Sequence, residues 1–303
     1  MLLPTLNENV KKLYRNSASL KLNYENVVIH SKLKDFVKRV DDSGLSIKTS
    51  LNGSEEYWID GEMHTVRPNT YLVVNRHQSF DCYLKSPKEI EGFCFYISPT
   101  LLSEVIETHQ FELKDLLAKE GCTGREQIVF REQIHHMKEN VLGLYLERLM
   151  PILKNMLEEN RWIWDFNSLY FNLAEKLVES HIEMTQRITR LSSVKNSTRE
   201  ELYRRLSLAF AFICDNYHKD IQLDQLARIA AISKYHLLRS FKLVYGITPY
   251  QKILQLRLER AKELLSKDYN LEEIAYEVGF SDRRSFTKAF KKAYQAPPSA
   301  FRL

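Results

Sequence analysis

The feature that most constrains the fold of this chain is an internal repeat in its last third. The segment "LDQLARIAAISKYHLLRSFKLVYGITP" begins at Leu223, and the similar segment "LEEIAYEVGFSDRRSFTKAFKKAYQAPP" begins at Leu271. The copies align at an offset of 48 for Leu223, Leu226, Ala227 and Ser233, and at an offset of 49 for Phe241, Lys242 and Tyr245. The extra residue falls in or just after a turn. A repeat of this kind predicts two copies of one supersecondary unit.

Each copy is predicted to hold a short helix, a tight turn and a second helix. Small residues at the turns, Ala231 and Gly279, allow two helices to approach, and Ser281 or Asp282 can cap the last helix. The second helices combine an apolar face (Leu237, Phe241 and Val244; Phe286, Phe290 and Ala293) with a cationic face (Lys234, Arg239 and Lys242; Arg283, Arg284, Lys288 and Lys291). This is the plan of a helix-turn-helix, whose second helix lies in the major groove of DNA.

One long helix is predicted between the two units. The segment "TPYQKILQLRLERAKELLSK" offers Thr248 as the N-cap and Pro249 as the first helical residue. Its apolar positions are Ile253, Leu256, Leu258, Ala261, Leu264 and Leu265. A straight helix of this length fixes the distance between the units.

Two such units, the joining helix and the ending "FTKAFKKAYQAPPSAFR" resemble the DNA-binding domain of the AraC/XylS family of bacterial transcription regulators, over residues 199–303. The resemblance places the units at about 222–246 and 270–294. It also implies base-facing roles for Tyr235, Leu238, Arg239, Arg283, Arg284, Thr287 and Lys288. Lys242, Lys291 and Lys292 lie nearer the helix ends, where phosphate contact is expected, and Lys234 completes the DNA-binding set. Two positions depart from the pattern: Ala296 stands where glycine is common, and Leu238 where a polar base reader is common.

A cationic helix face by itself is usually only a solvated surface. Two copies at a fixed separation favour DNA binding instead, and the distribution of charge agrees. Residues 199–303 carry 19 Lys and Arg against 12 Asp and Glu, whereas residues 1–198 carry 25 against 27. The last third is therefore expected to meet a polyanion, and the rest of the chain to do something else.

Residues 43–99 have the pattern of short antiparallel strands. Asp60-Gly61 separates two alternating segments, which is a strong hairpin signal, and "TYLVVN", "SFDCYL" and "EGFCFYI" follow. The pattern fits a small barrel or a sandwich. The resemblance implies a cupin-like β-barrel at about 20–98, followed by helices at about 99–185, in a domain of residues 1–185. The predicted fold class is therefore α+β, with an all-α bipartite helix-turn-helix domain after the barrel.

A barrel of this size can hold one small ligand in its mouth. The residues predicted to bind such an effector are Tyr57, Trp58, Arg67, Tyr71, Arg76, His77, Tyr83 and Phe95. The alternative is that most of these aromatic side chains only fill the core.

A metal, a cofactor and an enzymatic activity are not expected. No His-x-His pair occurs in the chain, His64 and His77 are isolated, and the adjacent His135 and His136 fall on a predicted helix, where their side chains diverge. The four cysteines (Cys82, Cys94, Cys122 and Cys214) are scattered and predicted to be reduced. Phosphate-binding glycine loops and nucleophile-elbow motifs are also missing from the sequence.

Helices are predicted at 99–119, 131–158 and 163–185. In the last of these Phe166, Tyr170, Leu173 and Leu177 recur at three- and four-residue steps and predict a helical seam. The seam fits a dimerisation surface, and it fits equally a helix that docks on its own barrel. The segment 186–198 lacks that stripe and is rich in Ser, Thr and Arg, so it is the predicted linker.

The longest uninterrupted apolar run, "LAFAFIC" at 208–214, is far too short to span a bilayer, so no membrane association and a cytoplasmic location are expected. The sequence as a whole predicts a homodimeric transcription regulator that binds promoter DNA. It is expected to be an activator that contacts RNA polymerase and responds to a small-molecule effector. The alternative is a regulator that needs no ligand, with the barrel acting only as a dimerisation or protein-interaction module.

Overall fold

The computed structural model describes residues 10–14, 25–109, 128–159, 165–191, 195–267 and 269–302. The chain divides into two compact units, Met1–Gln186 and Arg187–Leu303. Among the described helices, none combines the length and the apolar character needed to cross a membrane.

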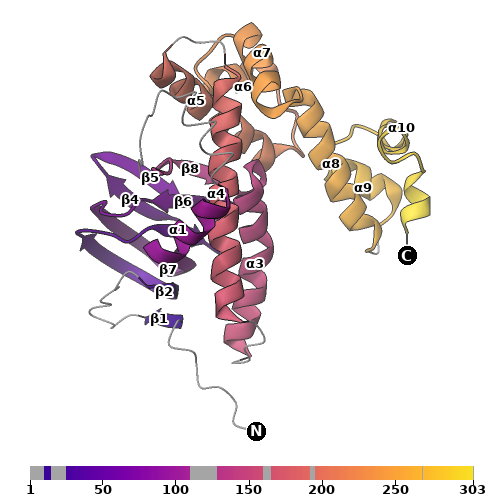
Figure 1. Cartoon of the computed structure of the whole chain (residues 1–303). Coiled ribbons are helices and arrows are strands. Elements are labelled where there is room, and N and C mark those ends of the chain that lie inside the picture. Colours follow the sequence, from indigo (N-terminus) through magenta and orange to yellow (C-terminus); the bar gives the residue numbers. More distant parts are fainter. Residues whose placement is uncertain are drawn as a thin grey trace. The chain divides into compact units, whose positions relative to one another are not determined.

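The first unit is built on an eight-stranded sheet that forms a nearly closed barrel (Figure 1). The strands are β1 (Val10–Tyr14), β2 (Val27–Val40), β3 (Ser46–Ser50), β4 (Glu55–Ile59), β5 (Glu62–Val66), β6 (Thr70–Val74), β7 (Phe80–Tyr96) and β8 (Ile134–His136). They run in the order β1-β2-β7-β3-β6-β8, and β4 pairs with both β5 and β7. All pairs except β1 with β2 are antiparallel. The predicted α+β class with an N-terminal barrel is confirmed.

The strands differ from the prediction in length. The hairpin at Asp60-Gly61 is present, between β4 and β5. The segments "SFDCYL" and "EGFCFYI", however, belong to one strand of 17 residues, β7. The Lys- and Pro-containing stretch between them does not end the strand. It forms a bulge, where the register against β2 shifts between Leu33 and Asp35, and the pairing with β2 continues on both sides. Proline is tolerated at such a bulge, where no ladder hydrogen bond is lost.

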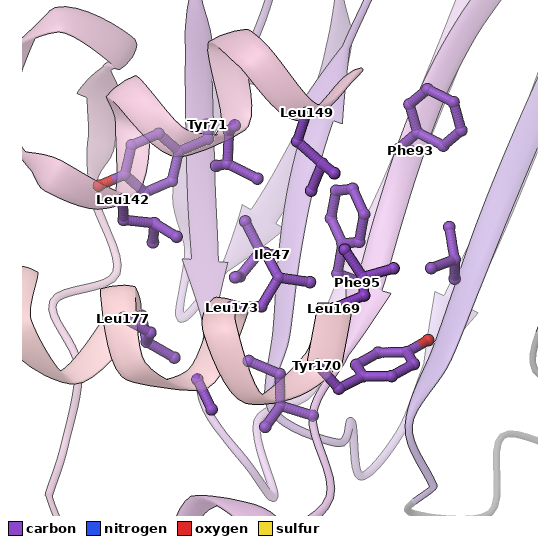
Figure 2. Close-up of a cluster of buried hydrophobic side chains, with 14 of the residues drawn as sticks. Ile47, Tyr71, Phe93, Phe95, Leu142, Leu149, Leu169, Tyr170, Leu173 and Leu177 are labelled. Carbon is purple, nitrogen blue, oxygen red and sulfur yellow. The ribbon is translucent and has the colours of Figure 1, made fainter. Parts of the chain in front are cut away.

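Three helices cover one face of the sheet: α1 (Pro99–Thr108), α3 (Val141–Glu158) and α4 (Phe166–Thr189). Figure 2 shows how their side chains meet those of the strands, with Leu149 of α3 and Leu173 of α4 close to Ile47 and Phe95 of the sheet. All of these side chains are almost fully buried. The opposite face of the sheet is enclosed by β4 and forms the barrel interior, where Tyr57, Phe80 and Leu72 pack together.

The helix predicted at 131–158 begins ten residues later than expected, since α3 starts at Val141. His135 and His136 lie on β8, which pairs with β6, and not on a helix. The reason is the side chain of Asn140, which accepts the Gly143 amide and caps α3 at that point. For the helix predicted at 99–119, the part beyond Thr108 falls almost entirely outside the described residues.

The predicted dimerisation seam is wrong for its four side chains. Phe166, Tyr170, Leu173 and Leu177 are at most 5% exposed within a single chain and belong to the core between α4, α3 and the sheet. The alternative, that the helix docks on its own barrel, describes what is found. The periodicity could not separate the two cases, because a sheet and a second helix demand the same apolar stripe.

The second unit is all α-helical. Its elements are α5 (Asn196–Asn216), α6 (Leu223–Ile229), α7 (Lys234–Tyr245), α8 (Pro249–Leu265), α9 (Leu271–Glu277), α10 (Arg283–Tyr294) and the 3-10 turn η2 (Pro298–Phe301). Thr248 caps α8 and Pro249 is its first residue, as predicted, and the six predicted apolar positions of α8 are all buried.

The linker predicted at 186–198 is too long, because α4 continues to Thr189 and α5 already begins at Asn196. Ile188, in the last turn of α4, is fully buried.

The C-terminal ends of the two second helices share a left-handed residue. Gly246 follows α7 with φ 74°, and Gln295 follows α10 with φ 57°. The two positions correspond at the offset of 49, so the residue that replaces the usual glycine is Gln295, and the assignment to Ala296 is wrong. A residue with a Cβ is strained in this conformation, whereas glycine is not.

We therefore expect opposite effects from two matched substitutions. Gln295→Gly should stabilise the second unit by about 0.5–1 kcal/mol, and Gly246→Ala should destabilise it by about 1 kcal/mol. A Cβ at Gly246 would meet no neighbouring atom, so only backbone strain is tested there. Scanning calorimetry of the full chain measures both. Tryptophan fluorescence identifies the transition of the first unit, because all three tryptophans (Trp58, Trp162 and Trp164) lie in it. Equal shifts of the same sign would contradict the assignment.

Acid is expected to destabilise the first unit through His181 of α4. Burial, with a smaller effect from the nearby Arg131, lowers the pKa of His181 to about 4, and its ring packs edge-on against Phe130. Between about pH 6.5 and 4 the unfolded chain binds a proton that the folded chain does not. The free energy of unfolding should therefore decrease as the pH is lowered through this window, by up to roughly 3 kcal/mol. Urea titrations followed by tryptophan fluorescence at several pH values measure the slope, and His181→Gln should flatten it.

Candidate nucleic-acid interface

The two helix-turn-helix units repeat each other down to single hydrogen bonds. In the first turn the amide of Ile232 donates to Ala227 O and that of Ala231 to Arg228 O. In the second turn Phe280 donates to Ala275 O and Gly279 to Tyr276 O, at the offset of 48. The N-caps of the second helices are Ser233 and Asp282, at the offset of 49, so the extra residue lies inside the turn.

The second helix of the first unit, α7, is held by its caps and by three buried side chains. The hydroxyl of Ser233 accepts the amide of His236 at 3.3 Å. Leu237, Phe241 and Val244 are at most 1% exposed, and Phe241 packs against Phe210 of α5 with ring centroids 6.3 Å apart. This burial leaves the opposite face of α7 in solvent.

The second helix of the second unit, α10, is held in the same way. The Asp282 carboxylate accepts the Ser285 amide at 2.7 Å, and hydrogen bonds from the Ser285 amide and hydroxyl lower the pKa of that carboxyl. Phe286 and Phe290 are fully buried against α8 and α9. Ala293, expected on this apolar face, is exposed. Because the pKa of Asp282 is lowered, this capping carboxylate is ionised at neutral pH, where it complements the positive end of the helix dipole.

The predicted DNA-binding cations all lie on the exposed faces of α7 and α10. They are Lys234, Arg239 and Lys242, and Arg283, Arg284, Lys288, Lys291 and Lys292. Lys234 contacts Asp224 of α6 at 2.6 Å. For the other seven, no carboxylate within the described residues lies at salt-bridge distance. Two exposed faces with a surplus of unpaired positive charge are suited to a polyanion.

The uncharged members of the predicted set differ in exposure. Tyr235 is 76% exposed and Leu238 is 38% exposed, so both can reach a partner from the first two turns of α7. Thr287 is only partly exposed. An exposed leucine on a recognition helix can contact a thymine methyl group, but it cannot hydrogen-bond a base edge.

The eight residues predicted to bind an effector do not form one site. Tyr71 and Phe95 are buried on the face of the sheet that the helices cover, where the Tyr71 hydroxyl donates to Asn140 Oδ1 at 2.9 Å. Tyr57 is buried inside the barrel. The remaining five are exposed: Trp58, Arg67, Arg76, His77 and Tyr83. The strand alternation that the sequence shows could not tell which face looks inward.

Two of the exposed residues border a surface pocket of about 780 Å³. Trp58 of β4 and Tyr83 of β7 line it on the outside of the barrel, together with charged side chains that include Arg39 and Asp81. Each of the two aromatic side chains is 40% exposed.

The barrel interior contains a buried lysine that the sequence analysis missed. Lys48 of β3 is 4% exposed, and its ammonium donates to Cys94 Sγ and to Tyr96 Oη, both at 3.1 Å. It also lies over the rings of Tyr96, Phe80 and Tyr57, at 4.7, 4.9 and 5.9 Å from their centroids. The signal in the sequence is a lone cation within the otherwise uncharged strand "LSIKTSL".

The neighbours of Lys48 form a polar cluster within the apolar barrel. Glu55 is buried beside Tyr57, whose hydroxyl donates to Glu55 Oε2 at 2.6 Å, and burial raises the pKa of this carboxyl. In the described part of the chain, no carboxylate lies within salt-bridge distance of Lys48. Cation–π contacts and two hydrogen bonds therefore replace the usual ion pair around a buried ammonium group.

The described residues contain one group that could hold a metal ion, and the sequence analysis did not consider it. His109, which follows α1, lies close to Glu175 and Glu179 of α4, with one ligand atom of each within 4.8 Å of the others. Lys176 already contacts Glu179 at 2.8 Å and Glu175 at 3.4 Å, so a cation is present at these carboxylates. Cys82 and Cys94 are free thiols, Cys214 is buried, and Cys122 lies outside the described residues.

Two families match this chain. Residues 226–303 match a family described as a helix-turn-helix domain, and residues 33–141 match one described as an AraC-like ligand binding domain. The second match covers most of the barrel, and the first covers both recognition helices.

Three relatives illustrate the likeness. An uncharacterized HTH-type transcriptional regulator of Bacillus subtilis, YbfI, is 24% identical over 73% of this chain and 70% of its own length. The probable transcription factor PqrA of Proteus vulgaris is 38% identical over 28% of this chain and 70% of its own length. The HTH-type transcriptional activator RhaS of Escherichia coli is 31% identical over 36% of this chain and 40% of its own length.

Proposed function

Because the chain belongs to the AraC/XylS family of transcription regulators, with a helix-turn-helix domain and a ligand-binding domain, we propose that it reads a specific DNA sequence with α7 and α10 together. One observation supports this most directly. The apolar faces of both helices are buried, and seven cations on their opposite faces have no acidic partner among the described residues.

The individual roles follow from position along each helix. Arg239 of α7 and Arg283 and Arg284 of α10 lie in the first two turns, and arginine can bind guanine in bidentate fashion. Lys291 and Lys292 lie in the last turn of α10, where contact with phosphates is expected. The arginines are thus proposed to carry specificity, and the lysines affinity.

The barrel is proposed to sense a small-molecule effector at the cluster around Lys48. The ammonium of Lys48 is buried without a carboxylate at salt-bridge distance among the described residues, and it lies over the aromatic rings of Phe80 and Tyr96. The ligand chemistry that fits is an anionic or strongly hydrogen-bond-accepting group. This reading replaces the set of eight residues expected from the sequence, of which only Tyr57 belongs to the cluster.

Further parts of the proposal concern the way the regulator works in the cell. We propose an activator, as RhaS is by its name. We also propose that it is cytoplasmic, has no enzymatic activity and contacts RNA polymerase. A homodimer is also proposed, through surfaces other than the buried face of α4. We also propose that residues 1–185 form the domain that senses the effector and that residues 199–303 form the domain that binds DNA.

The DNA-binding proposal predicts different defects for arginines and lysines. Arg239→Ala and Arg283→Ala should each cost about 1–3 kcal/mol on the preferred sequence and relax base preference. Lys291→Ala should weaken binding to all sequences alike and lower the salt dependence by about one phosphate contact. The measurement selects preferred sites from random duplexes with the full chain, and then titrates each variant at several salt concentrations.

Arg260→Ala is the matched control for these variants, because Arg260 is a cation of α8 that pairs with Glu263 at 2.8 Å. It should retain both affinity and specificity. The proposal fails if the full chain selects no sequence, or if substitutions on α7 and α10 leave binding unchanged.

The sensing proposal predicts that the response to a ligand depends on the charge of Lys48. Lys48→Met keeps the approximate size of the side chain and removes the charge. A thermal-shift screen of small carboxylates and sugars, read by tryptophan fluorescence, should find a stabilising compound for the natural chain that has no effect on the variant. Lys85→Met on the exposed surface is the control. A folded variant that keeps the response contradicts the assignment.

A further inference from the structure

The loop between α5 and α6 lies against the joining helix α8. Arg257 of α8 reaches this loop with its guanidinium group, donating from Nε to Tyr217 O at 2.7 Å and from Nη2 to Lys219 O at 2.9 Å. Both acceptors are main-chain carbonyls, so the contact depends on the position of the loop backbone and not on its side chains. An arginine can satisfy two diverging carbonyls because its donors form a fixed planar fork.

The same loop touches the turn of the second helix-turn-helix unit. Gly279 has φ 93°, and a Cβ at this position would collide with the carbonyl of His218. Arg257 also lies over the ring of Phe280, 5.7 Å from its centroid, and Phe280 packs in turn on Phe286 of α10. The loop at 217–219 is thus in contact with α8 and with the second turn at once.

This arrangement adds an off-axis contact to the joining helix. A single helix fixes the distance between two units along its axis, but rotation about that axis is limited only by what packs beside it. The loop at 217–219 directly precedes α6 of the first helix-turn-helix unit, and Gly279 and Phe280 lie in the turn of the second helix-turn-helix unit, so the contact between them opposes such rotation. Arg257 holds the loop in the position at which this contact is made.

We propose that Arg257 is a positioning residue for DNA recognition, which fixes the orientation of α10 relative to α7 and thereby the spacing of the two half-sites that the protein accepts. The proposal rests on the proposed function, namely that both helices enter DNA. Gly279 is the second element of the same contact, since only a residue without a Cβ allows the loop to approach.

The first test needs no DNA. Labels carried by a non-canonical amino acid at positions 242 and 291 of the full chain report the distance distribution between α7 and α10. The natural chain should give one narrow distribution, Arg257→Ala and Gly279→Ala broader or shifted ones, and Arg257→Lys an intermediate one. The control Arg260→Ala should match the natural chain, since Arg260 lies on the same helix but bonds only to Glu263 among its described partners. Unchanged distributions in both variants would overturn the proposal.

The second test measures spacing tolerance on the selected duplex. Inserting two base pairs between the half-sites rotates them by about one fifth of a helical turn, and should weaken the natural chain by about tenfold or more. Arg257→Ala should bind the original duplex more weakly but lose less than about threefold on insertion, because its two units can adjust. Parallel losses in the natural chain and the variant would contradict the positioning role. If the natural chain bound no sequence at all, the proposed function would fail, while the distance measurement would still decide the role of Arg257.

Discussion

The burial of Phe241 and Phe290, one at the same place in each repeat, is the constraint on which the DNA-binding unit depends. Each ring is fully buried and packs at a tilt against the tyrosine that ends its helix, Tyr245 or Tyr294, at 4.6 Å between centroids. With these rings anchored, the rotation of α7 and α10 about their own axes is set. The cations one or two residues from each ring (Arg239 and Lys242; Lys288, Lys291 and Lys292) are turned away from it by roughly 100° per residue and face solvent. The chemistry of the exposed face is thus a consequence of the packing of the other face.

The joining helix α8 packs with both helix-turn-helix units and so links their orientations. Its apolar residues Leu258, Ala261 and Leu265 lie in the core of the second helix-turn-helix unit, while Arg257 on its side holds the loop that precedes the first helix-turn-helix unit. The helices α7 and α10 therefore belong to one packed structure and are not independent units joined by a flexible linker. A body of this kind reads two segments of DNA at a defined separation, whereas independent units would bind each segment separately.

The barrel unit follows a different logic. One face of its sheet is closed by α3 and α4, so the long apolar stripe of α4 is used within the chain. The other face closes on itself around Lys48, whose ammonium lies over aromatic rings and donates hydrogen bonds to a cysteine sulfur and a tyrosine hydroxyl. A well-packed apolar interior would be more stable, and the polar cluster is the place where this barrel departs from that solution.

The sequence by itself determined the helix-turn-helix repeat, the caps of α8 and α10, the joining helix and the exposed cationic faces, because these depend on local periodicity and capping that a few adjacent residues specify. Only the tertiary structure decided where the strands place their side chains. Alternation shows that Tyr57 and Tyr71 point to definite faces, but not that one face is the barrel interior and the other lies under two helices. The same holds for β8, for the intramolecular role of α4, for the cluster at Lys48 and for the contact of Arg257 with the loop at 217–219. Each of these joins residues that are distant in the chain, and their proximity is a property of the packed fold and not of any local pattern.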